Sequence, residues 1–384
     1  MKKIVVAMDS MKGCLDSLSA SEALAAGVRK CFPSCEIVCV AVADGGEGTS
    51  DALAYGKGGF RKVTSNVTGP LGRKIDAEWY IDEKSGVAFI DMASASGLAI
   101  VAEEERNPLH TTTFGVGELI KEAVGCGVKK VLLGLGGSAT VDAGLGACQA
   151  MGLIILDKAG NAMPAPFVGS MLPEIGGFDF SRMPEFSFEL LLLCDVTAPF
   201  TGEEGAARVF APQKGASNQD VEYLETGMEN VRKLIFDISG FDLNDKPGSG
   251  AAGGAAGGLM AFVGGKIEKG AALLLDAIGF DDSIEGADLI ITGEGSSDRQ
   301  TLMGKIPYEI LRQGKRRNIP VWLVAGRIAD REALYAAGFE EIICINSPGI
   351  VERSGTSGEN ALDPEVAKKR LSSFGIELFD RLSV

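Results

Sequence analysis

The sequence predicts an α/β protein with two α/β domains, one of them a doubly wound, Rossmann-like parallel sheet built from both ends of the chain. Apolar runs recur along the 384 residues, and glycine-rich turns and helical patterns follow several of them. The runs near the carboxyl terminus resemble those of the first seventy residues more than those of the middle. We therefore expect residues 1–70 plus 285–384 to form the Rossmann-like domain, with residues 71–284 inserted as a second α/β domain.

The first seventy residues have the pattern of a βαβ unit. Residues 3–8 form a continuous apolar run, which is typical of a strand buried on both faces of a parallel sheet. Ser19 and Glu22 have the spacing of a capping box and predict the start of a helix. Residues 36–43 then form the next strand, so a parallel pair is expected.

The same order of strand, turn and helix recurs later in the chain. Further strand-like runs lie at residues 128–134, 189–194, 287–295, 319–328 and 341–346. Residues 68–91 differ, because polar and apolar residues alternate there around a turn at 83–86, which predicts an antiparallel hairpin. The second domain is expected to begin near this hairpin.

The charge of the chain excludes several classes of partner. Its 37 Lys and Arg residues against 52 Asp and Glu residues give a formal net charge of −15. A broad surface for nucleic acid or for an anionic membrane is therefore not expected. The apolar stretch before Asp9 is too short for a signal peptide, and no other segment is long enough to cross a bilayer.

Cysteine usage predicts a reducing compartment. The eight cysteines contain no C-x-x-C pair and are scattered through apolar runs, which indicates buried free thiols and a cytoplasmic protein. Cys31, Cys35 and Cys39 are spaced like a row of ligands, but Pro33 prevents one helix from aligning them, so no metal is assigned there.

Five glycine-rich turns with acidic or hydroxyl residues are the main functional signal. Glycine lets the backbone approach a ligand closely, and successive N–H groups can form a concavity for phosphate or carboxylate oxygens. In an open parallel sheet ligands bind beyond the carboxyl ends of the strands, where all five turns are expected. The turns are DSMKG at residues 9–13, ADGGEGT at 43–49, GLGGSAT at 134–140, GSGAAGG at 248–254 and ITGEGSSD at 291–298.

Two of these turns also match the dinucleotide-binding fingerprint. The match that begins at Gly134 follows a predicted strand and has Asp157 about 20 residues further on, as the fingerprint requires. An NAD-dependent hydroxy-acid dehydrogenase is therefore an alternative. Such an enzyme usually needs a histidine or lysine as acid/base beside the site of hydride transfer. His110 is the one histidine in the chain. A P-loop is excluded because no GxxxxGK[ST] segment is present.

The turns also contain the groups that phosphoryl transfer requires. Cations must neutralise the phosphates, carboxylates must hold magnesium, and a base or orienting group must act on the attacking hydroxyl. Lys12, Lys214 and Lys305 lie in or beside the turns. The carboxylates at or just after the predicted strand ends are Asp9, Asp44, Asp142, Asp195, Glu294 and Asp298.

With these residues identified, the chain resembles the bacterial type I glycerate kinases over essentially its whole length. The shared segments include DSMKG, VADGGEGT, TGPLGR, RNPLHTTTFGVGELI, GLGGSAT, CDVT, GAARVFAPQKGAS, PGSGAAGG, ITGEGSSDRQTLMGK and VAGRI, in the order found in that family. The resemblance implies ATP-dependent phosphorylation of D-glycerate with Mg²⁺. It also implies two α/β domains with the active site in the cleft between them.

The chain departs from the usual family pattern at a few positions inside these segments. The family usually has Asn and Gly where this chain has Val141 and Ala143, and Asn where it has Ala198. The usual Arg-Leu-Asp-Gly is Ser-Ser-Asp-Arg at residues 296–299. These changes remove amide and guanidinium donors, which puts the substrate preference in question.

From the residues and the resemblance together we expect four groups of site residues. Asp195 accepts or orients the proton of the glycerate hydroxyl, and Lys12 neutralises phosphate charge. Glu294 and Asp298 hold magnesium. The residues expected to bind ATP are Ser10, Gly13, Gly136, Gly137, Ser138 and Lys305. Those expected to bind glycerate are Asp44, Gly45, Gly46, Arg208, Lys214 and Arg299.

Two questions stay open at this stage. The resemblance favours 2-phosphoglycerate as product, and 3-phosphoglycerate is the alternative. The sequence does not predict the oligomeric state, because an interface patch has the same composition as a core patch.

Overall fold

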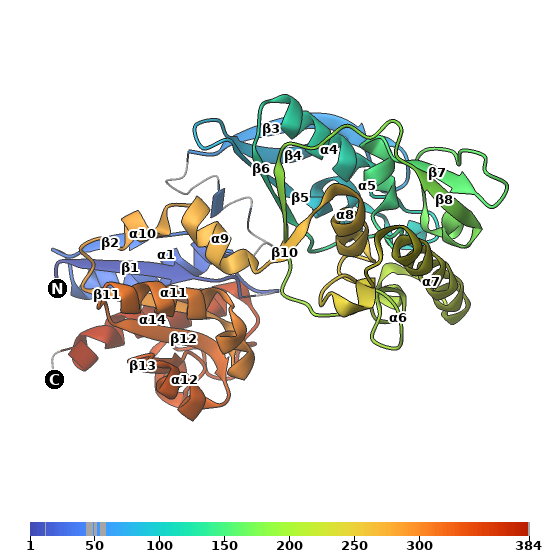
Figure 1. The fold of residues 1–384 in the computed structure, drawn as a ribbon. Helices are drawn as coiled ribbons and strands as arrows, with labels where there is room; N and C mark the ends of the chain where they lie inside the picture. Colours follow the sequence, from blue (N-terminus) through green and yellow to red (C-terminus); the bar gives the residue numbers. More distant parts are fainter. Residues whose placement is uncertain (12, 44–48, 50–51, 54–58, 383–384) are drawn as a thin grey trace. The chain divides into compact units, whose positions relative to one another are not determined.

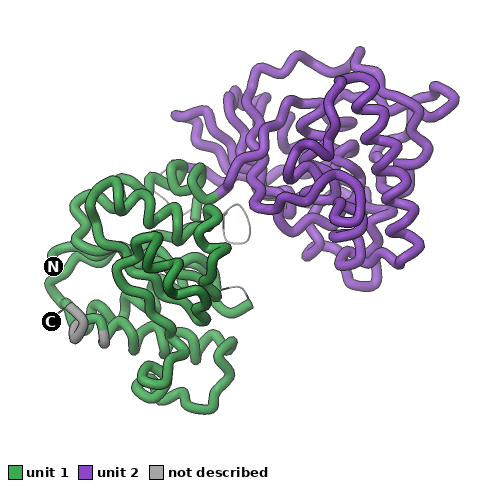
Figure 2. Tube along the Cα trace, turned by 60° about the horizontal axis from the view of Figure 1, so that its bottom comes forward, with its two compact units in different colours: residues 1–59, 271–384 green, residues 60–270 purple. Residues whose placement is uncertain are grey.

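The computed structural model describes residues 1–384 except 12, 44–48, 50–51, 54–58 and 383–384. Within these residues the chain divides into two compact units. The first contains Met1–Gly59 and Ala271–Val384, and the second contains Phe60–Gly270 (Figure 2). The α/β class, with one parallel sheet from both chain ends and a second sheet inserted, is thus confirmed.

The first unit contains a five-stranded sheet in the order β13-β12-β11-β1-β2, and every neighbouring pair is parallel (Figure 1). Its strands are β1 (Lys3–Met8), β2 (Glu36–Cys39), β11 (Leu289–Ser297), β12 (Val321–Ile328) and β13 (Glu341–Cys344). Residues 4–8 of β1 are buried on both faces, as the continuous apolar run predicts. The second strand ends at Cys39, earlier than expected.

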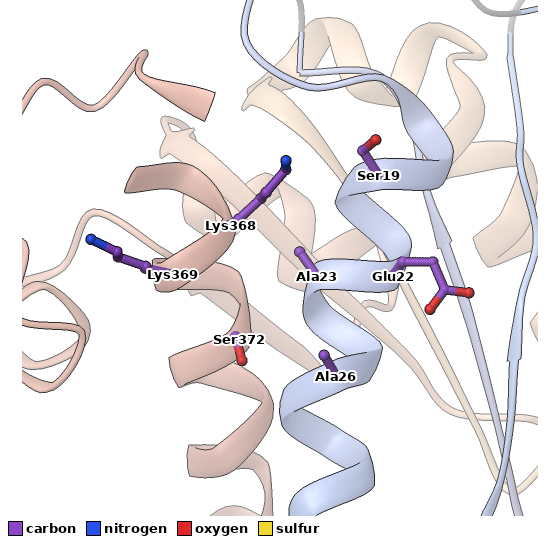
Figure 3. A pocket seen from close by; sticks show the side chains of 7 residues that line it. All are labelled: Ser19, Glu22, Ala23, Ala26, Lys368, Lys369 and Ser372. Carbon is purple, nitrogen blue, oxygen red and sulfur yellow. The ribbon is translucent and has the colours of Figure 1, made fainter. Parts of the chain in front are cut away.

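One face of this sheet packs against α1 (Ser17–Cys31) and α14 (Pro364–Leu382). The two helices approach closely, because a Cβ added at Gly27 would lie 2.0 Å from the carbonyl oxygen of Ser372. Figure 3 shows Ala23 and Ala26 on the side of α1 that faces α14. The shallow groove there carries Glu22 and Lys368, whose charges are already paired with Arg29 and Glu365.

The capping prediction for α1 needs a correction. The helix begins at Ser17, and its N-cap is Asp16 rather than Ser19. The carboxylate of Asp16 accepts hydrogen bonds from the Ser19 amide at 2.7 Å and from Ser19 Oγ at 2.6 Å. An aspartate three positions before the predicted capping box therefore satisfies a free amide of the first turn. Further helices of this unit are α9 (Gly270–Ala277), α10 (Phe280–Ser283), η6 (Arg299–Met303), α11 (Ile306–Arg316), α12 (Arg331–Ala337) and α13 (Pro348–Arg353).

The second unit contains a six-stranded mixed sheet in the order β10-β9-β6-β5-β4-β3. The strands are β3 (Arg61–Thr68), β4 (Lys74–Asp82), β5 (Val87–Asp91), β6 (Lys130–Gly134), β9 (Glu189–Leu193) and β10 (Lys266–Glu268). β4 and β5 pair antiparallel around the turn at 83–86, so the predicted hairpin is confirmed. β5, β6, β9 and β10 are parallel to one another, and their carboxyl ends therefore lie at one edge.

Helices of the second unit pack against one face of this sheet and share one apolar core with it. Val116, Leu119 and Ile120 of α4 (Phe114–Gly125) are buried in that core with Leu133 of β6. A separate two-stranded ribbon of β7 (Ile154–Asp157) and β8 (Ile175–Asp179) is antiparallel. The remaining elements are α3 (Met92–Ser96), η1 (Leu98–Ile100), η2 (Glu103–Glu105), α5 (Leu145–Ala150), η3 (Gly169–Glu174), α6 (Ala206–Phe210), η4 (Pro212–Lys214), α7 (Asn218–Ser239), η5 (Leu243–Asp245) and α8 (Ala255–Val263).

Two of the glycine-rich segments do not lie as predicted. GSGAAGG at 248–254 follows η5 rather than a strand, and Gly250 donates its amide to the carbonyl of Ala198 at 3.0 Å. ITGEGSS lies inside β11 and is not a turn. Gly293 is needed there because a Cβ at this position would lie 1.7 Å from the carbonyl oxygen of Val324 on the neighbouring strand.

Candidate functional site

Three parallel strands of the second unit end side by side. The last residues of β5 and β6, Asp91 and Gly134, are partners in the sheet register, and Gly134 pairs on its other side with Leu193 of β9. Asp195 follows Leu193 by two residues and is exposed. The GLGGSAT turn begins at Gly134. This edge therefore brings two carboxylates and a glycine turn together, as the rule for open parallel sheets predicts.

Asp91 is the site candidate that sequence reasoning missed. It is the N-cap of α3, and its carboxylate accepts a hydrogen bond from the amide of Ala93 at 3.0 Å. Burial raises the pKa of Asp91 to about 6, and the single amide bond offsets this only in part. An aspartate directly after the apolar run at 87–90 was the available sequence signal.

The GLGGSAT turn is held from one side by the segment after α3. The amide of Leu98 donates to the carbonyl of Gly137, and the amide of Ala139 donates to that of Ser96, each at 2.8 Å. Gly137 has a φ of +68°, which favours glycine. Within the described residues the amides of Gly136 and Gly137 form no hydrogen bond, and both glycines are exposed. Two backbone donors are therefore available to an anion.

Lys214 holds the same turn from inside the protein. Its side chain is buried, with 2% of the residue exposed, and its Nζ donates to Ser138 Oγ and to the carbonyl of Thr140, each at 2.7 Å. Burial lowers the pKa of Lys214 to about 7, although the charge of Asp142 acts in the opposite direction. Lys214 therefore shapes the turn through two neutral acceptors.

Asp142 fixes the chain just after the turn. Its buried carboxylate accepts hydrogen bonds from the amide and hydroxyl of Thr113 at 2.8 Å and from the amides of Gly144 and Gly146 at 3.1 and 3.3 Å. Desolvation raises the pKa of Asp142, whereas these hydrogen bonds act to lower it. With four donors on it, this carboxylate anchors the start of α5 to the loop before α4.

In the first unit, Glu294 of β11 is the centre of a compact polar cluster. Only 6% of the residue is exposed. Its carboxylate accepts from Thr301 Oγ1 at 2.6 Å and from Ser297 Oγ at 3.1 Å, and it forms an ion pair with Lys305 Nζ at 3.2 Å. The sequence analysis expected Glu294 to hold magnesium and Lys305 to bind ATP, and in the structure the two side chains are in contact.

The expected magnesium ligands do not form a metal centre in the described part of the chain. The charge of Glu294 is balanced by Lys305, and the carboxylate of Asp298 caps η6 by accepting from the amide of Gln300 at 2.7 Å. No cluster of three or more His, Cys, Asp or Glu side chains suited to a metal occurs among the described residues. Both carboxylates have partners within the first unit, and their role as Mg²⁺ ligands stays a prediction.

Other predicted residues lie at separate places in the two units. Ser10 and Gly13 follow β1, where the Ser10 amide donates to Asp9 Oδ1 at 2.7 Å and Gly13 has a φ of +72°. Arg299 is exposed, and its Nε lies 3.8 Å from Oδ1 of Asp330. Arg208 pairs with both oxygens of Glu222 and lies 3.7 Å from Glu203. Lys12, Asp44, Gly45 and Gly46 lie outside the described residues.

The structure does not support the dinucleotide reading of the turn at Gly134. The helix that follows, α5, begins only at Leu145, so the turn does not open directly into a helix. Asp157 ends β7 in the antiparallel ribbon, and its carboxylate accepts from the amide of Asn161 at 2.8 Å. It is therefore not at the end of the next parallel strand, where the fingerprint requires an acid.

The comparisons with known proteins agree with the phosphoryl-transfer reading. The model of the glycerate kinase family matches residues 4–367. Glycerate 2-kinase of Escherichia coli K12 is 39% identical over 330 residues, 85% of this chain and 86% of that protein. Glycerate kinase of Bacillus subtilis 168 is 38% identical over 91% of both chains.

A solved structure extends this likeness to three dimensions. The crystal structure of a protein from Salmonella typhimurium LT2 assigned as glycerate kinase 2 superposes with a TM-score of 0.81 at 36% identity. The superposition covers 100% of this chain and 98% of the Salmonella chain. The chain belongs to the glycerate kinase family, and the kinase predicted from its sequence is thereby confirmed.

Proposed function

We propose that this chain transfers the γ-phosphoryl group of ATP to the 2-hydroxyl of D-glycerate. The observation that carries the proposal is the family match over residues 4–367, which includes both sheet edges with their glycine segments. The 2-position rests on the relative named glycerate 2-kinase, which shares 39% of its residues over most of both chains. Transfer to the 3-hydroxyl is the alternative.

The free amides of Gly136 and Gly137 are proposed to bind phosphate oxygens of ATP. They are exposed, unbonded within the described chain, and fixed by hydrogen bonds on either side. Preorganised donors of this kind stabilise negative charge without rearranging during the reaction. Lys214 and Ser138 serve this site by holding the turn in shape, because the lysine amine is buried behind it.

Asp195 is proposed to accept the proton of the attacking hydroxyl. It lies just beyond the end of β9 and is exposed, so a substrate can reach it. Asp91 is the alternative that the structure introduces, because its pKa of about 6 suits a base that works near neutral pH. A base at Asp91 and a base at Asp195 predict different pH profiles of kcat, so the measured profile distinguishes the two assignments.

ATP and Mg²⁺ complete the proposal. A kinase requires a phosphoryl donor, and we propose ATP accompanied by Mg²⁺, which neutralises phosphate charge when bound. Because Glu294 and Asp298 are engaged within the first unit, their role as metal ligands stays a prediction. A cytoplasmic location is also proposed, since all eight cysteines are free thiols. None of the described helices is long and apolar enough to cross a membrane.

A coupled assay tests the proposal directly. The purified chain is incubated with ATP, Mg²⁺ and D-glycerate, and ADP release is followed; the reaction is then repeated with NAD in place of ATP. Glycerate-dependent ADP release is the expected result. NADH formation without ADP would instead revive the dehydrogenase alternative.

A further inference from the structure

The first unit has a small cavity at the carboxyl edge of its parallel sheet. The cavity has a volume of about 140 Å³, and its walls include Met11 after β1, Gly295 of β11, Gly326 and Arg327 of β12, and Asn346 after β13. Among the residues that the structure describes, none of those assigned above to phosphate, metal or proton transfer is part of the lining. It is therefore a separate feature of the same sheet edge.

The topology of the sheet gives this edge a special position. From β1 the chain continues to β2 on one side, whereas β11, β12 and β13 follow one another outward on the other side. The direction of winding thus reverses between β1 and β11. In open parallel sheets ligands bind in the crevice beyond such a reversal. The cavity, with walls from β11 and from the loop after β1, lies at this crevice.

The lining is apolar with a few polar groups in defined places. Met11 and Leu362 supply aliphatic surface, and Leu362 is 65% exposed although it is a large apolar residue. Arg327 is exposed, and its guanidinium forms no hydrogen bond or ion pair within the part of the chain that the structure describes. Such a lining suits a flat, largely apolar ring with a nearby anionic group, since a guanidinium can stack on a ring or pair with a phosphate.

Asn346 is held rigidly at the wall by a buried arginine. Arg370 has only 4% of its surface exposed, and it donates from Nη1 to Asn346 Oδ1 at 2.5 Å and from Nε and Nη2 to Thr356. Asn346 Nδ2 in turn donates to the carbonyl of Gly326 at 2.7 Å. One N–H of the amide stays available to a ligand, and its orientation is fixed.

We propose that this cavity receives the adenosine part of ATP, an inference that rests on and deepens the proposed function. A purine presents apolar faces and ring nitrogens that can accept the remaining Asn346 N–H. Glycerate carries a carboxylate and two hydroxyls on three carbons, so its site needs a dense set of donors, which this lining lacks. The chemistry of the wall thus assigns the first unit to the nucleoside.

Titration calorimetry on the full-length chain with Mg²⁺ tests the assignment. Leu362→Ser removes aliphatic surface from an exposed side chain, so folding is not at risk, and Ile238→Ser on α7 is the matched control with 55% exposure. The probes are ADP and inorganic tripolyphosphate, with adenosine as a competitor of ADP. Leu362→Ser is expected to weaken ADP binding about tenfold, or ~1.4 kcal/mol, without changing tripolyphosphate binding.

Arg327→Ala gives a second and independent readout, with Lys369→Ala on α14 as its control. It is expected to weaken ADP binding and to raise the KM for ATP, with the KM for glycerate unchanged. The proposal is overturned if neither variant changes ADP binding by more than twofold, if adenosine fails to compete with ADP, or if the KM for glycerate rises instead. A wild-type chain that binds ADP through this cavity but forms no phosphoglycerate would refute the proposed function alone.

Discussion

The two sheet edges differ in how their charges are balanced. In the first unit, the carboxylate of Glu294 has an ammonium partner in Lys305 and two hydroxyl donors. In the second unit, Asp91 has one amide donor, and Lys214 donates to two neutral oxygens. The cost of burying these charges appears in the pKa values, which move to about 6 for Asp91 and about 7 for Lys214.

This difference separates charges that maintain the fold from charges that a substrate can complete. A balanced pair gains little when a charged ligand arrives, whereas an unbalanced buried group gains a partner. The edge of the second unit, with Asp91, the glycine turn and Asp195, is therefore where we expect proton and phosphate chemistry. The first unit is expected to supply the rigid cavity and the neutralised Glu294 cluster.

The largest effect is expected from the exposed carboxylate after β9. Asp195→Asn should lower kcat by about 10²–10⁴-fold, because it removes the group proposed to take the hydroxyl proton. Steady-state kinetics of the purified variant measure this, with Asp179→Asn at the end of β8 as a matched control. Near-normal turnover would remove Asp195 from the mechanism and shift the role to Asp91.

The pH profile of wild-type kcat sharpens the choice between the two carboxylates. If Asp91 is the base, turnover needs its ionised form, so kcat should fall as pH drops through about 6. Asp91→Asn would then abolish most of the activity, and the remaining kcat would no longer fall as pH drops through about 6. If Asp195 is the base, Asp91→Asn keeps the shape of the acid limb.

A smaller effect is expected from the buried lysine. Lys214→Met keeps the length of the side chain but leaves Ser138 Oγ and the Thr140 carbonyl without their donor. The KM for ATP should rise by about tenfold as the turn loses its shape, which corresponds to ~1.4 kcal/mol. Kinetics with varied ATP at saturating glycerate check this value. A rise in the KM for glycerate alone would instead support the original prediction that Lys214 binds glycerate.

The same substitution changes how stability depends on pH. The pKa of Lys214 is lower in the folded chain than the usual 10.5, so the unfolded chain binds the proton more tightly. Wild-type stability should therefore rise as pH increases from about 7 to about 10. Denaturant unfolding of Lys214→Met should lack this contribution. If stability depended on pH with the same slope in the wild type and in Lys214→Met, this would contradict the buried position of the amine.

Asp91 gives the opposite linkage, with a gain in stability on substitution. Its pKa is raised from 3.8 to about 6 on folding, so its contribution to stability falls as pH rises between these values. At pH 7.5, Asp91→Asn should stabilise the chain by at most about 3 kcal/mol while keeping an N-cap side chain. Thermal and denaturant unfolding measure this gain, and a destabilised variant would show that the ionised carboxylate is well accommodated.

The smallest change is expected in the first unit. Glu294→Gln keeps an acceptor for Ser297 and Thr301 and loses only the ion pair with Lys305, so stability should fall by about 1 kcal/mol or less. The Mg²⁺ concentration for half-maximal activity should not change. Glu309→Gln, which breaks the pair with Arg312, is the matched control. A large rise in the Mg²⁺ requirement would restore Glu294 as a metal ligand.

The sequence predicted the strands more reliably than the partners of charged side chains. Continuous apolar runs such as 3–8 and 130–134 form strands because burial on two faces leaves no polar position. The contact between Glu294 and Lys305 was not predictable, since it depends on how η6 turns back toward β11. Asp91 was missed because an aspartate after a strand is also the usual helix cap, which it is here.

The position of GSGAAGG shows a second limit of sequence reasoning. Glycine composition predicted a ligand turn, but the segment is closely packed. Gly250 lies against Pro199 after β9, Gly253 lies against Thr140 after β6, and neither position leaves room for a Cβ. Close packing and ligand binding both require glycine, so composition alone does not distinguish them. Hydrogen-bond donors without an acceptor among the described residues, as at Gly136 and Gly137, are visible only in three dimensions.

The most direct test is phosphorus NMR of the reaction of the purified chain with ATP, Mg²⁺ and D-glycerate. We predict one new phosphomonoester signal, from 2-phosphoglycerate, that grows as the ATP signals decline, and its near absence with Asp195→Asn. A signal from 3-phosphoglycerate would contradict the assigned hydroxyl. No phosphoglycerate at all would contradict the proposed function, and full activity of both Asp195→Asn and Asp91→Asn would contradict the proposed role of the second unit.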